Sequence, residues 1–161
     1  MLLRAFLILT ALFFFACGGA PAEKETAVPE VPPTVEEGEK LLEQGEFEKA
    51  NEAFSQIVAD EPDNAEAHYY LALASKNLGD IEGAEEHYRL AIGYDAKLSA
   101  AHNNLGLLLL EKGDLVHAET ELNTYLKQKP DDSSANYNYG LVLEAMGKLA
   151  EAKTYYEKSA E

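Results

Sequence analysis

The sequence repeats itself every 34 residues from residue 31 onward. Residues 67–85 read AHYYLALASKNLGDIEGAE, and residues 101–119 read AHNNLGLLLLEKGDLVHAE. Four copies in one register predict an architecture of stacked repeats. Alanine, glycine and a large side chain each recur at a fixed position, namely at Ala50, Ala84, Ala118 and Ala152, at Gly45, Gly79, Gly113 and Gly147, and at Phe54, Tyr88, Leu122 and Tyr156.

The first half of each period predicts a helix. In the third copy, apolar or small residues and one histidine lie at i, i+3, i+4 and i+7 within residues 102–109, which places them on one helical face. Gly113 follows this run and tolerates the left-handed backbone that ends many helices. The helix is therefore expected to end there.

The second half of the period predicts another helix, packed closely on the first. Asp114 is a suitable N-cap for a helix over residues 115–128, and Pro130 prevents that helix from continuing. The small residues Gly106 and Ala118 allow the two helices to approach each other. Each period thus predicts an antiparallel helix pair.

Charge excludes one class of partner. The chain carries 13 Lys and Arg against 29 Asp and Glu, a formal net charge of −16. Phosphate backbones require clustered cations, so nucleic-acid binding is not expected. Hydrophobic residues make up 47% of the chain, which is enough to build a buried core.

The first residues predict export from the cytoplasm. Arg4 precedes an uncharged apolar run, residues 5–16, which is shorter than the roughly 20 residues of a membrane-spanning helix. This pattern predicts a signal peptide over residues 1–16. The single cysteine, Cys17, lies at the expected cleavage point.

Around Cys17 the sequence resembles a bacterial lipoprotein signal. Ala16 before the cysteine and Gly18 and Gly19 after it fit that pattern. Phe14 and Phe15 depart from it, because such signals usually have leucine three residues before the cysteine and a small residue two before it. The resemblance implies diacylglyceryl attachment to Cys17, cleavage before it and acylation of the new amino terminus. Two or more acyl chains anchor a protein stably. The alternative is ordinary cleavage nearby, with Cys17 removed or left as a free thiol.

A proline-rich segment separates this cysteine from the repeats. Residues 18–34 contain four of the six prolines and no helical periodicity. Proline favours extended backbone and lacks a hydrogen-bond donor, so residues 17–34 are expected to form a lipidated, disordered tether.

The repeat pattern resembles the tetratricopeptide repeat over residues 31–161. The resemblance implies an all-α, right-handed solenoid of antiparallel helix pairs over residues 35–161, with repeats at about 31–64, 65–98, 99–132 and 133–161. Polar residues replace larger ones at both ends, where Thr34, Glu37 and Ser159 are typical of capping repeats.

In this family the first helices of the repeats line a concave groove that binds ligands. Asparagine amides both donate and accept hydrogen bonds, and tyrosine is enriched at interface hot spots, so the composition suits an extended peptide. The alternative is that the asparagines are ordinary surface residues and the leucines belong to the core. The resemblance assigns these groove residues: Tyr69, Tyr70, Leu73, Lys76, Asn103, Asn104, Leu107, Tyr137, Asn138 and Leu141.

Clamping of terminal carboxylates, metal binding and catalysis are not expected. Lys76 is the only basic residue among the mapped groove positions, which disfavours a clamp for terminal carboxylates. His68 and His102 are predicted to be packing residues, and His87 and His117 have no partner at metal-ligand spacing. No catalytic constellation and no cofactor or metal site is recognised.

These features predict a lipid-anchored scaffold outside the cytoplasm that binds another protein or an extended peptide segment. The first helix of the third repeat, which contains the run NNLGLLL, is similar to type IV pilus-assembly members of the family. Localisation in the cell envelope is expected, at the outer membrane facing the periplasm. The alternative is an accessory or regulator of a peptidoglycan or outer-membrane assembly enzyme.

Overall fold

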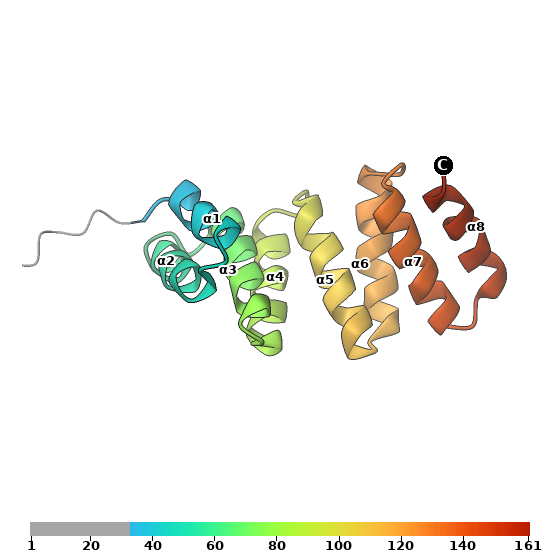
Figure 1. Ribbon diagram of the computed structural model, residues 1–161, viewed down its shortest axis with the longest axis horizontal. Helices are drawn as coiled ribbons and strands as arrows, with labels where there is room; N and C mark the ends of the chain where they lie inside the picture. The colour runs from blue at the N-terminus through green and yellow to red at the C-terminus, as the bar shows by residue number, and fades with distance from the viewer. Residues whose placement is uncertain (1–32) are drawn as a thin grey trace, which may run out of the picture. The chain divides into compact units, whose positions relative to one another are not determined.

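In the computed structural model, residues 33–161 are described, and the predicted signal peptide, Cys17 and most of the tether lie outside them. Within these residues every regular element is an α-helix, as the sequence predicts, and each repeat contributes two helices (Figure 1). The helices are α1 (Val35–Glu43), α2 (Phe47–Asp60), α3 (Ala65–Asn77), α4 (Ile81–Tyr94), α5 (Ser99–Lys112), α6 (Leu115–Gln128), α7 (Ser133–Ala145) and α8 (Leu149–Ser159).

Local chemistry sets the ends of these helices. The glycine between the two helices of every repeat has positive φ, from 75° at Gly45 to 85° at Gly79, a conformation that costs glycine little. The Asp114 side chain accepts a hydrogen bond from the backbone N–H of His117 at the start of α6. The predicted helix over 115–128 and its cap are therefore confirmed.

Within a repeat, the two helices meet where a large side chain fills the space left by a glycine. A Cβ atom on Gly106 would lie 2.6 Å from Cγ of Leu122, and one on Gly140 would lie 2.6 Å from the ring of Tyr156. Gly38 faces Phe54 in the same way. Ala118 is fully buried, as close packing requires, but the side chain that occupies the space at Gly106 is Leu122.

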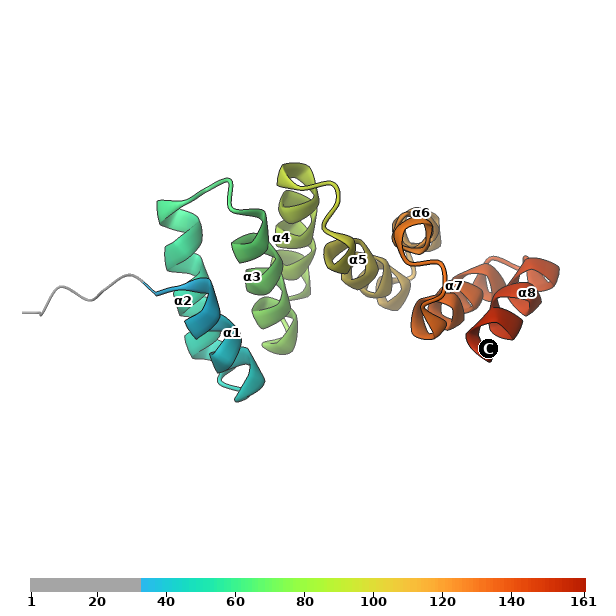
Figure 2. The ribbon, with the colours of Figure 1, turned by 90° about the horizontal axis from the view of Figure 1, so that it is seen from above.

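Between repeats, the second helix of one pair packs on the first helix of the next. These contacts join α2 to α3, α4 to α5 and α6 to α7. The first helices of some repeats also contact each other directly, α1 with α3 and α5 with α7. Within residues 33–161, no pair of second helices makes a contact of that extent. The first helices are therefore the more closely spaced row. Figure 2 shows that the helix direction turns along the stack, so that α6 is seen nearly end-on.

The polar residues at the two ends have local roles. Thr34 is the N-cap of α1 and forms a capping box with Glu37, whose carboxylate accepts from the Thr34 backbone N–H at 2.9 Å. Ser159 is half-buried and donates to the carbonyl oxygen of Tyr156 at 2.7 Å. Both side chains form hydrogen bonds with backbone groups at the end of a helix.

The contact at Gly106 yields a stability prediction. We expect Gly106→Ala to lower the free energy of unfolding by about 1–3 kcal/mol, because the added methyl group overpacks against Leu122. In the double variant with Leu122→Ala, the loss should be smaller than the sum of the two single losses. Urea denaturation followed by circular dichroism measures all three values.

Gly93→Ala is the matched control. A Cβ atom at Gly93 in α4 meets nothing within 4 Å, and alanine favours helix over glycine by about 1 kcal/mol. This variant should be as stable as the parent protein or more stable. Additive losses at Gly106 and Leu122 would show that the two side chains do not compete for one space.

Candidate partner-binding groove

The predicted groove residues lie on α3, α5 and α7, which belong to the closely spaced row of first helices. Nine of the ten are half-buried and Tyr137 is 50% exposed. They therefore line a surface that solvent reaches, and none of them belongs to the fully buried core. Their intramolecular contacts differ between the two ends of the row.

The α3 end of the groove is packed by aromatic rings. The Tyr70 ring stacks on Phe54 of α2, with ring centres 5.3 Å apart and an interplanar angle of 17°. Tyr69 meets Tyr70 edge-on, with ring centres 5.0 Å apart. Such pairs add to the stability of the fold. Tyr70 thus helps to hold the second repeat on the first.

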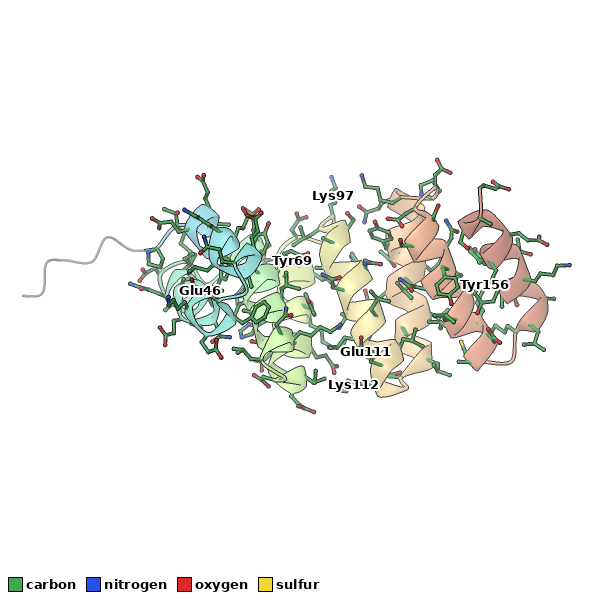
Figure 3. All side chains as sticks on the ribbon, in the orientation of Figure 1. Glu46, Tyr69, Lys97, Glu111, Lys112 and Tyr156 are labelled. Carbon is green, nitrogen blue, oxygen red and sulfur yellow. The ribbon has the colours of Figure 1, made fainter. Side chains whose placement is uncertain are left out.

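Two polar contacts join α3 to α5 across the groove. Asn104 donates from Nδ2 to the hydroxyl oxygen of Tyr69 at 3.1 Å. Lys76 Nζ lies 3.1 Å from a Glu111 carboxylate oxygen. Tyr69 and Glu111 mark the two helices in Figure 3. The only basic side chain among the mapped positions is therefore already paired with an acid.

A buried hydroxyl lies beneath this junction. Tyr88 of α4 is fully buried, and its hydroxyl has no hydrogen-bond partner within residues 33–161. The side-chain amide of Asn104 lies beside the Tyr88 hydroxyl but does not form a hydrogen bond with it. Burial raises the pKa of Tyr88, and burial likewise raises the pKa of Tyr69. Both phenols therefore remain neutral at physiological pH.

The α5–α7 end of the groove has unused polar groups. Within residues 33–161, the side-chain amides of Asn103 and Asn138 make no hydrogen bond, although both residues are half-buried. Leu107 and Leu141 occupy the same position in successive repeats and are also half-buried. This end combines free donors and acceptors with apolar surface.

The last repeat closes this end with tyrosines. The rings of Tyr137 and Tyr156 lie 5.5 Å apart between centres. The Tyr156 hydroxyl donates to the Glu144 carboxylate, which raises the pKa of Tyr156 to about 12 (Figure 3). A shallow depression next to Tyr137 is lined by Ser133, Ser134, Tyr137, Asn138 and Ser159.

Comparison with known protein families identifies these repeats. Three profiles described as tetratricopeptide repeat match residues 35–98, 77–137 and 133–161, and together they cover all eight helices. The chain is a tetratricopeptide-repeat protein. Members of this family bind other proteins or peptides, so the fold is a scaffold suited to protein–protein interaction.

Solved structures with the same fold include MamA and PilF. A crystal structure of MamA has a TM-score of 0.74 at 25% identity and covers 78% of this chain and 74% of that one. PilF of Pseudomonas aeruginosa has a TM-score of 0.70 at 31% identity and covers 78% of this chain but 57% of that one. MamA of Desulfovibrio magneticus RS-1, at 22% identity and a TM-score of 0.71, is similar in fold. No curated protein of similar sequence was found.

Position 4, the fourth residue of each tetratricopeptide repeat (Thr34, His68, His102 and Asn136), has a role in the last three repeats that the sequence did not reveal. Three of these side chains bond a backbone carbonyl six residues earlier, in the loop that enters the repeat. His68 reaches the Pro62 carbonyl at 3.0 Å, His102 reaches that of Ala96 at 3.2 Å, and Asn136 reaches that of Pro130 at 2.9 Å. His68 and His102 are 3% and 6% exposed, so the prediction that they are packing residues is confirmed.

His87 has a neighbour that the sequence did not reveal. Its Nδ1 atom lies 3.1 Å from Nδ1 of His68, across the contact between α3 and α4. Sequence spacing could not show this contact, because the two histidines are 19 positions apart and the chain reverses direction between them. Within residues 33–161, no three histidine, cysteine, aspartate or glutamate side chains gather as metal ligands would. His117 bonds Asp114 at 2.7 Å on its own helix turn.

None of the eight tetratricopeptide helices has both the length and the apolar composition that a membrane span requires. The predicted lipidation site, Cys17, lies outside the described residues.

Two neighbouring asparagines should respond differently to alanine. We expect Asn104→Ala to lower the free energy of unfolding by about 1 kcal/mol, because the bond to Tyr69 is lost. Asn103→Ala should change it by less than about 0.5 kcal/mol, because its amide has no partner in residues 33–161. Urea denaturation distinguishes the two. Equal losses would contradict the assignment of Asn104 to the α3–α5 junction.

Proposed function

We propose that this protein is a lipid-anchored scaffold of a bacterial cell envelope and that the α5–α7 end of its groove binds a partner polypeptide. The observation that carries the proposal is the pair of unused amides, Asn103 and Asn138, beside the half-buried Leu107 and Leu141. An extended peptide offers backbone groups to the amides and side chains to the leucines. An amide pairs with a peptide backbone whatever the side chains are.

Charge restricts the partner. Lys76 is paired with Glu111, and Glu144 also lies on the groove side. A terminal carboxylate or an acidic segment would find no free cation among the mapped positions and would meet carboxylates. The proposed partner is therefore a neutral or basic, partly apolar segment rather than an acidic chain terminus.

Anchoring and location rest on the sequence. The apolar run, the cysteine at its end and the proline-rich tether support lipidation at Cys17 and a position at the outer membrane facing the periplasm. The likeness to PilF at 31% identity and the NNLGLLL helix support a role in assembling an envelope complex such as a type IV pilus. The family profiles that match are all tetratricopeptide repeats, and we propose a binding role without catalysis.

Site-specific crosslinking tests the binding surface. A photoreactive residue at Tyr137, which is 50% exposed, should crosslink a partner in intact cells. The same residue at Val116, which is 63% exposed on the second helix α6, is the matched control and should not. Mass spectrometry of the adduct identifies the partner and shows whether it is a peptidoglycan or outer-membrane assembly enzyme. Equal adducts at both positions would contradict the groove assignment.

Replacing both free asparagines should weaken partner binding without unfolding the protein. Each lost hydrogen bond is worth about 1 kcal/mol, so Asn103→Ala with Asn138→Ala should raise the dissociation constant about 30-fold. Asn123→Ala, on α6, is the control and should leave it unchanged. The measurement is titration of the crosslinked partner segment as a synthetic peptide. Unchanged affinity in the double variant would place the binding surface elsewhere.

Lipidation has its own test. Cys17→Ser should move the protein from the membrane fraction to the soluble fraction, or leave it with its signal uncleaved, because serine cannot be acylated through a thioether. Fractionation and immunoblotting read out the result. Membrane retention of a correctly cleaved serine variant would argue against the anchor.

A further inference from the structure

Two successive repeats place equivalent but chemically different pairs between their helices. In the second repeat, His68 of α3 faces His87 of α4. In the third repeat, His102 of α5 faces Glu121 of α6, with Nδ1 2.6 Å from a carboxylate oxygen. The partners are 19 residues apart in both pairs. The protein therefore carries two versions of one contact.

The entry loop determines where one proton lies. Nε2 of His68 and Nε2 of His102 each face a backbone carbonyl, which can only accept a hydrogen bond. Both Nε2 atoms must therefore carry a hydrogen. The remaining nitrogen, Nδ1, decides how each pair responds to pH.

Between His68 and His87 there is room for one proton. Their ring centres are 5.3 Å apart and their Nδ1 atoms 3.1 Å apart, so the two nitrogens lie between the ring centres and face each other. One nitrogen must donate and the other accept. The pair can hold a single positive charge on one ring. A second charge would place hydrogens on both facing nitrogens and break the bond.

The His102–Glu121 contact, in contrast, is favoured when the imidazole is protonated. An imidazolium donates from both nitrogens and so satisfies the Ala96 carbonyl and the Glu121 carboxylate together. Adding a proton to His102 strengthens this contact, whereas doubly protonating the His68–His87 pair destroys its counterpart.

The groups around the histidine pair do not cancel this effect. His68 is 3% exposed and stacks on Tyr94 of α4, with ring centres 5.4 Å apart. The carboxylates that act on His87 are Glu86 on the same helix and Asp80 at its start. Burial lowers the pKa of His87, the charge on His68 lowers it further, and these two carboxylates oppose the shift.

We propose that the His68–His87 pair is a proton-sensing switch in the second repeat, which loosens the α3–α4 contact on acidification and so regulates the groove. The regulation rests on the proposed function. His68 directly precedes Tyr69, which joins α3 to α5 through Asn104, and Tyr70, which packs on Phe54. A movement of α3 at His68 would carry Tyr69 and Tyr70 with it, because the three residues are consecutive.

The sign of the pH effect follows from proton linkage. His87 has a lower pKa in the folded protein than the ordinary value of about 6.5 that it regains on unfolding. The unfolded chain then binds more protons than the folded one below that value. Stability is complete above about pH 6.5 and falls as the pH drops below it.

A reciprocal exchange of the two partners tests the switch. His87→Glu converts the second pair into the third, and Glu121→His converts the third into the second. Urea midpoints of the full chain are measured about one pH unit above and one below the ordinary histidine pKa of about 6.5. The parent midpoint should fall on acidification. His87→Glu should lose at least half of that fall, and Glu121→His should increase it.

His117→Gln is the matched control, because it removes a histidine whose side chain is 59% exposed and that does not belong to either pair. Its midpoint should still fall on acidification, because the His68–His87 pair is intact. The same fall in the parent protein and in His87→Glu would overturn the proposal. So would a fall that disappears in His117→Gln.

Ring NMR gives a readout that stability alone cannot. The chain has four histidines, so each ring signal can be assigned by one substitution. In the folded protein, the His68 and His87 signals should shift together as the pair takes up its first proton, and a second proton should be taken up only as the α3–α4 contact opens. Independent titrations of the two rings, each near the ordinary pKa, would overturn the proposal. Neither experiment uses a partner, so their failure would leave the groove proposal to its own tests.

Discussion

The structure depends on one packing interaction that recurs down the stack. A large side chain of each second helix fills the space beside a small residue of its first helix, as Leu122 does at Gly106 and Phe54 at Gly38. This contact lets the two backbones approach closely and buries the large side chain, with Phe54 and Leu122 fully inaccessible to solvent. Each repeat then offers its outer faces to its neighbours, and stability accumulates through neighbouring interfaces.

A second recurring contact ties successive repeats together. Position 4 uses its side chain to satisfy a carbonyl in the entry loop, through histidine in two repeats and asparagine in the fourth. Because the loop carbonyl needs only a hydrogen-bond donor, the residue at position 4 can be histidine or asparagine. The group that faces it from the second helix can also vary. This freedom allows His68 and His102 to face groups as different as imidazole and carboxylate.

The groove combines structural and available side chains on one row of helices. At α3, Tyr70 packs on Phe54 and Tyr69 accepts from Asn104, so these residues hold repeats together. At α5 and α7, Asn103 and Asn138 have no hydrogen bond within residues 33–161. Family position alone assigns all ten residues to one surface. The contacts separate them, because a side chain already bonded within the protein must give up that bond to hold a ligand.

The sequence by itself determined the helix pairs, their register and their ends, because periodicity, capping aspartates and the interhelix glycines act over a few residues. It also indicated which positions are small and which are large. Only the tertiary structure decided that Leu122 fills the space at Gly106, that Asn104 reaches Tyr69, and that His87 meets His68. Such pairs join different helices, and a contact between helices depends on their crossing and on side-chain direction, which a one-dimensional pattern does not contain.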